Sequence, residues 1–170
     1  MPSGQPMGAS GSQPPPRQAA PSAPDAPRPV EMLVEPKLIR DPRLRALVGM
    51  DQKALDRATR AGDFRMVAVV LRSLLAGVVW DAALQRRREI KLQGTPDSWA
   101  MPDVIEALLG DSLGHADVLQ VANLDRCGEL MHPPAQLARP QVINRETVDA
   151  FRSLVRTIAA HLVGAAAPSR

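Results

Sequence analysis

The longest run of helical spacing covers residues 63–94, "DFRMVAVVLRSLLAGVVWDAALQRRREIKLQG". Asp63 stands where an N-cap is expected, and Gly94 follows a basic stretch that suits the C-terminus of a helix. One apolar stripe repeats every three or four residues and further apolar residues widen it: Phe64, Val67, Val70, Leu71, Leu74, Leu75, Val78, Val79 and Ala82. The pattern predicts a central helix that is nearly buried over its middle turns, with Gly77 at a close contact to another helix.

Two shorter helical patterns precede the central one. In residues 35–49, Asp41 stands as a cap before Pro42, and the pattern predicts a short helix that ends near Gly49. In residues 51–62, Asp51 is the expected N-cap and Gly62 the expected stop. Both helices are basic, and the second is predicted to be mostly amphipathic.

Three more helices are predicted after the central one. Residues 95–110 suit a short helix, and residues 115–132 suit a longer one with Val118, Val121, Leu124 and Met131 on one side, stopped by two prolines. Residues 133–143 are predicted to form a loop. Asn144 then caps a last helix to Gly164, whose apolar stripe is Val148, Phe151, Leu154, Val155, Ile158 and Leu162.

Because no alternating strand pattern or hairpin signal is present, the expected fold is all-α. We expect a helical bundle of three long and two to three short helices, forming a single domain over residues 35–164. Residues 1–34 are rich in Pro, Ser, Gly and Ala, and ten of the 17 prolines precede residue 37. Such a leader has too few large apolar residues to fold, so we expect it to be disordered, as we do the tail 165–170.

The composition excludes several classes of protein. Two Phe, two Trp and no Tyr leave an aliphatic core and disfavour the modules that stack single-stranded bases on aromatic rings. The single cysteine, Cys127, allows no intrachain disulfide and no four-thiolate metal site, and a buried apolar role is expected for it. The histidines have no companions at metal-ligand spacing, so no metal and no cofactor are expected.

Location and source are inferred from composition as well. No uninterrupted apolar run approaches 18 residues and no basic segment followed by an apolar one opens the chain, so we expect a cytoplasmic protein that contacts no membrane. Arginines greatly outnumber lysines and alanine is abundant, which indicates GC-rich codons and a bacterial source.

The net charge of +3 is unevenly distributed. Residues 36–94 hold 13 Lys and Arg against six acids, whereas residues 95–170 hold six Arg against nine acids. The basic segment could bind RNA phosphates or an acidic protein surface, or could be a solvated helix face and helix end. Its candidate binding residues are Arg57, Arg60, Arg86, Arg87, Arg88 and Lys91.

The stretch "RCGELMH" places Arg126 and His132, with five residues between them, at the end of a predicted helix. Together with the central apolar helix and a last amphipathic helix, over about residues 63–163, this order resembles the HEPN family of small helical proteins. Cys127 differs from the small polar residue that is common after the family's Arg. An ordinary helix end without chemistry is the alternative, and "RTIAAH", Arg156 to His161, is a second match to the same loose pattern.

The resemblance implies an RNA-binding protein, and an endoribonuclease that works without metal, of a bacterial defence or toxin type. His132 would take the proton of the ribose 2′-hydroxyl and Arg126 would hold the phosphate. Six positions along a helix turn by about 240°, so the pair does not share one face, and a homodimer through the last two long helices would bring two pairs together. The alternative function is a catalytically inactive interaction or adaptor module within a larger protein assembly.

Overall fold

The computed structural model describes residues 32–138 and 141–164, and within these ranges the chain forms six α-helices and no strand. The predicted all-α bundle is thereby confirmed. The expected disordered leader and tail fall mostly on residues 1–31 and 165–170, which lie outside the described residues. The expected end of the leader at residue 34 is wrong, because Leu33 and Val34 are buried in the core of the bundle.

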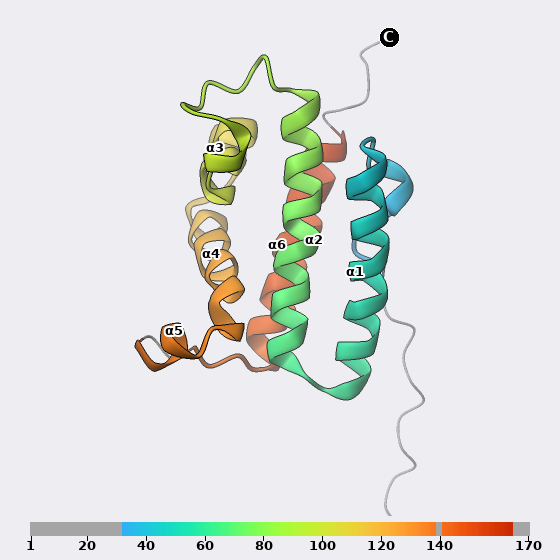
Figure 1. Cartoon of the computed structure of the whole chain (residues 1–170), viewed down its shortest axis with the longest axis vertical. Helices are drawn as coiled ribbons and strands as arrows, with labels where there is room; N and C mark the ends of the chain where they lie inside the picture. The colour runs from blue at the N-terminus through green and yellow to red at the C-terminus, as the bar shows by residue number, and fades with distance from the viewer. Residues whose placement is uncertain (1–31, 139–140, 165–170) are drawn as a thin grey trace, which may run out of the picture.

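The helices form three layers, a middle layer and one on each side of it (Figure 1). α2 (Phe64–Gln85) and α6 (Arg145–Gly164) lie in the middle, α1 (Pro42–Ala61) covers one side, and α3 (Met101–Leu109) and α4 (His115–Arg126) cover the other. A short α5 (Pro133–Ala138) lies at one end of the bundle. Four 3-10 helices connect these elements: η1 (Pro36–Leu38), η2 (Pro96–Ser98), η3 (Gly110–Ser112) and η4 (Cys127–Met131).

The two short helices predicted before the central helix are one helix, α1. The expected outer boundaries are right, because the Asp41 carboxylate accepts from the Arg43 and Leu44 amides and Gly62 ends the helix at a φ of 68°. The expected inner boundary is wrong. Gly49 continues the helix, and the Asp51 carboxylate accepts from the Ser73 hydroxyl of α2 (2.6 Å) instead of capping.

α2 is the predicted central helix, and Asp63 caps it through the Met66 amide (3.0 Å). The helix ends at Gln85, earlier than expected, and Arg86 is its C-cap. The Arg86 side chain donates to the Glu89 carboxylate (2.7 Å) and to the Leu108 carbonyl (3.1 Å). Among the described helices, α2 alone is long and apolar enough to cross a membrane, and 61% of that window is buried within the bundle.

Gly77 lies at a close contact between α1 and α2, as predicted. A Cβ on Gly77 would lie 2.6 Å from Val48 Cγ2, closer than any side chain tolerates. Val48 is itself fully buried, so the absence of a side chain at Gly77 is what lets α1 pack against α2.

The last third of the chain keeps its predicted order with two corrections. α4 ends at Arg126 and continues as η4, so Val118 and Met131 are more than half exposed rather than buried. The predicted loop 133–143 contains α5, because its prolines occupy first-turn positions where no amide donor is needed. The last helix agrees: the Asn144 side-chain oxygen, Oδ1, accepts from the Thr147 amide (2.9 Å), and the whole predicted stripe is buried.

Candidate functional site

The "RCGELMH" stretch spans the change from α4 to η4. Arg126 is the last residue of α4, η4 takes up Cys127–Met131, and His132 follows in an extended conformation. Cys127 and Leu130 are buried, whereas Arg126 and His132 are exposed. The inner side of the stretch therefore belongs to the core, and only its outer side could meet another molecule.

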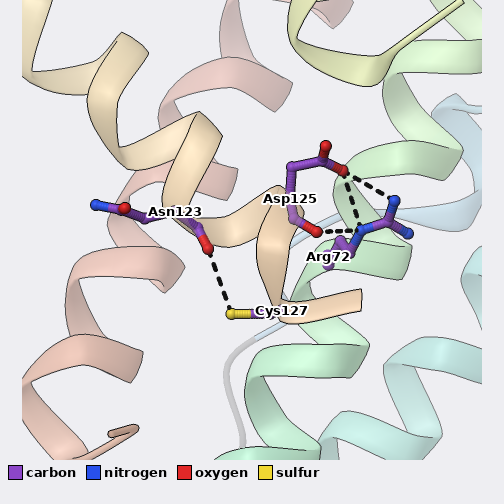
Figure 2. Close-up of polar contacts among 4 residues, drawn as sticks. All are labelled: Arg72, Asn123, Asp125 and Cys127. Atoms are coloured by element: carbon purple, nitrogen blue, oxygen red, sulfur yellow. Dashed lines mark hydrogen bonds and ion pairs between the residues drawn. The ribbon is translucent and has the colours of Figure 1, made fainter. Parts of the chain in front are cut away.

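Arg72 of α2 lies beside this helix end and holds it (Figure 2). Its Nε lies 2.9 Å from the Asp125 carbonyl oxygen and 3.1 Å from Asp125 Oδ1, and its Nη2 lies 2.8 Å from Oδ1. A Cβ on Gly128 would lie 2.9 Å from Arg72 Nε. The absence of a side chain at Gly128 therefore leaves room for the Arg72 guanidinium to reach the Asp125 carbonyl near the end of α4.

Arg65, which precedes Arg72 on α2, holds η4, the turn that follows α4. Its Nη2 donates to the Leu130 carbonyl at 2.7 Å. Carbonyl groups at a helix end lack intrahelical partners, and cations near them are favourable. Two arginines of α2 thus fix both the end of α4 and the end of η4.

Cys127 is fully buried, and its Sγ lies 3.5 Å from the Asn123 carbonyl oxygen (Figure 2). Burial raises the pKa of the Cys127 thiol to about 11, and the neighbouring Arg126 and Arg72 offset this only in part. Because the nucleophilic form of cysteine is the thiolate, Cys127 is not a nucleophile at neutral pH. The predicted role of a small buried apolar residue is confirmed.

A single chain does not bring Arg126 and His132 to a common site. Arg126 bonds Asn123 of its own helix and lines a hollow of about 420 Å³ between α4 and the start of α6. His132 does not line this hollow; its amide donates to the Glu129 carbonyl (2.9 Å) and its carbonyl accepts from the Gln136 amide (3.2 Å). The second match lies within α6, where His161 Nδ1 is 2.8 Å from the Thr157 carbonyl oxygen.

The candidate basic residues divide into two groups. Arg57 and Arg60 lie near the C-terminal end of α1, whereas Arg86, Arg87, Arg88 and Lys91 follow the C-terminal end of α2. Because α1 and α2 are antiparallel, the groups lie at opposite ends of the bundle, about 30 Å apart for a helix of this length (Figure 1). Arg60 is paired with Asp56 (2.9 Å) and Arg86 with Glu89 (2.7 Å).

The sequence prediction did not single out two charged residues that the structure uses, Arg72 and Asp81. Asp81 is 7% exposed, and its carboxylate accepts from the Arg40 amide (3.0 and 3.1 Å) and the Asp41 amide (2.8 Å). A signal for both was present in the sequence: Asp81 and Arg72 are single charged residues inside the apolar run of α2. Because buried charges are rarely left without partners, each indicates a polar contact with another part of the chain.

No group of three or more His, Cys, Asp or Glu side chains that could hold a metal occurs in the part of the chain that the structure describes. The chain matches no protein-family model, no curated protein and no solved structure.

Proposed function

We propose that the chain is a helical interaction module, and that a partner protein docks on the apolar surface formed by η4, α5 and the start of α2. We call this the η4–α5 surface. Its exposed members are Leu137, which is 87% exposed, and Met131, which is 60% exposed. The exposure of Leu137 is the observation that carries the proposal, because a large exposed apolar group beside an apolar hollow marks a protein contact more often than an isolated one does.

A hollow of about 640 Å³ adjoins these side chains. Its wall is mainly apolar, with Asp63, Arg65 and Gln136 contributing polar groups, and its apolar members are Met66, Leu130, Met131, Pro133 and Leu137. Methionine side chains are flexible and adapt to different contact surfaces. The hollow suits a bulky apolar side chain of a partner, inserted between η4 and α5.

α5 supports the same proposal because it has little to hold it in place. It is six residues long and contains no buried residue. An isolated helix of this length is not stable in water, so α5 depends on its contacts with η4. A partner that covered Leu137 would add the apolar contacts that α5 lacks.

A photo-cross-linker tests this proposal. With benzoylphenylalanine at position 137 of the full chain, we expect one discrete covalent adduct in the cells that make the protein, identified by mass spectrometry. The matched control is the same group at Leu84, which is 46% exposed on α2. The adduct should also disappear when Met131→Asp is added. Adducts from both positions, or from neither, would contradict docking at the η4–α5 surface.

A HEPN-like ribonuclease is the second candidate, and the exposure of both Arg126 and His132 favours it. Because the pair does not meet within one chain, this function needs a homodimer through α4 and α6. For an interaction module we expect the full chain to leave a pool of structured and single-stranded RNAs intact in EDTA. Cleavage that leaves 2′,3′-cyclic phosphates, is lost in His132→Ala and persists in His161→Ala would instead assign a metal-independent nuclease.

A further inference from the structure

Charge is separated across the three layers of the bundle. α1 carries five Arg and Lys against two Asp, whereas residues 101–131 of the opposite layer carry six acids against one Arg. α1 lies on one side of α2 and α6, and α3 and α4 lie on the other (Figure 1). The molecule therefore has a basic side and an acidic side that point away from each other.

The basic side carries an exposed apolar pair. Leu47 and Met50 are 49% and 57% exposed, although leucine and methionine in a helix usually face the core. Arg43, Lys53 and Arg57 are exposed on the same side of α1, at helical spacing from this pair, and none of them forms an ion pair within the described residues. We call these five residues the basic face.

The acidic side carries a second apolar pair. Val118 and Leu119 of α4 are 51% and 55% exposed. Exposed carboxylates occur before and after them along the chain, at Glu106, Asp111 and Glu129. We call these five residues the acidic face.

We propose that the chain associates with itself head to tail, with the basic face of one copy packed on the acidic face of the next. In this contact Leu47 and Met50 cover Val118 and Leu119, while the cations of α1 face the carboxylates of the next copy. A second copy is the occupant because this one chain carries both halves, an exposed apolar pair on a layer of each sign. Opposite charges around an apolar centre steer association and fix its orientation.

The placement of the two faces determines the kind of assembly. A contact between two different surfaces is heterologous, and it leaves one free surface of each kind on every pair of copies. Because the faces lie on opposite sides of the bundle, the contact extends into longer chains instead of closing as a two-fold dimer. This assembly differs from the two-fold dimer that a HEPN-like site would need.

Sedimentation velocity of the full chain over a range of concentrations tests the proposal. At low salt we expect species larger than a dimer to accumulate with concentration, and about 0.5 M NaCl to shift them toward the monomer because it screens exposed charges. Leu47→Asp and Leu119→Lys should each weaken association by at least about tenfold, since each places a charge in the apolar centre. Leu84→Asp is the matched control, an exposed leucine outside both faces that should leave association unchanged.

A mixture of the two variants decides whether the contact is heterologous. Leu47→Asp keeps its acidic face and Leu119→Lys keeps its basic face, so an equimolar mixture should form a dimer that contains one copy of each and grows no further. Circular dichroism confirms that both variants fold. A wild-type chain that stays monomeric, a mixture that stays monomeric, or a two-fold dimer insensitive to Leu47→Asp would each overturn the proposal. None of these results depends on Leu137, so the η4–α5 surface is tested separately.

Discussion

Asp81→Ala is expected to lower the free energy of unfolding by about 3 kcal/mol, one of the two largest losses we predict. The Asp81 carboxylate accepts from the amides of Arg40 and Asp41, which lie 41 and 40 residues away, respectively, just before α1. Alanine leaves both amides without this partner in a part-buried place, and an unmade hydrogen bond there costs about 1–3 kcal/mol for each group. Urea unfolding followed by circular dichroism measures the difference.

Two further variants make this result specific. Asp81→Asn keeps one acceptor oxygen and should recover part of the loss. Asp149→Ala removes an exposed carboxylate of α6 and should change the free energy of unfolding by less than about 0.5 kcal/mol. If Asp81→Ala were as mild as Asp149→Ala, the carboxylate would not be what fixes the start of α1.

Gly77→Ala is expected to lower the free energy of unfolding by about 2 kcal/mol, although alanine is the better helix former. The added methyl group would meet Val48 Cγ2 at 2.6 Å, so α1 must move away from α2 and lose contacts along its length. The same urea titration measures this change. Adding Val48→Ala should make the double variant less destabilised than the sum of the two single ones.

Gly49→Ala is the matched control, because Gly49 is also a helical glycine. Its nearest neighbour to an added Cβ is Pro36 Cγ at 4.0 Å, an ordinary contact. Without a clash, the gain in helix propensity should raise the free energy of unfolding by up to about 1 kcal/mol. Equal effects at positions 49 and 77 would mean that propensity, not helix packing, determines both.

Local signals in the sequence predict most of the fold. The apolar periods of α2 and α6 and the caps Asp41, Asp63 and Asn144 are contained within a few residues of each helix, so they can be recognised without a structure. Gly49 and Asp51 were misinterpreted as a break because a glycine next to a capping residue is the usual sign of one. The actual role of Asp51 depends on Ser73, which is 22 residues away in sequence.

The candidate site was harder to predict than the fold because its contacts are long-range. The sequence predicts a helix that ends at His132, whereas α4 ends at Arg126, and the residue that fixes this end, Arg72, is 53 residues from Asp125. The requirement for Gly128 follows from Arg72 as well. The Arg and His pattern therefore indicates that a helix ends here, while the contacts that require Asp125 and Gly128 at this end come from Arg72 of α2.

The central position of α2 also has a consequence for synthesis of the protein. Among the described helices, α2 alone is long and apolar enough to cross a membrane. α6, which packs against α2 in the middle layer, is the last of these helices along the chain. The ribosome adds residues 86–164 after α2 is complete, which takes several seconds at about 5–20 residues per second. During that interval the nascent chain exposes an apolar helix long enough to be taken for a membrane segment. Until α6 emerges, α1, then α3 and α4, and chaperones are what can keep α2 from aggregation or mistargeting.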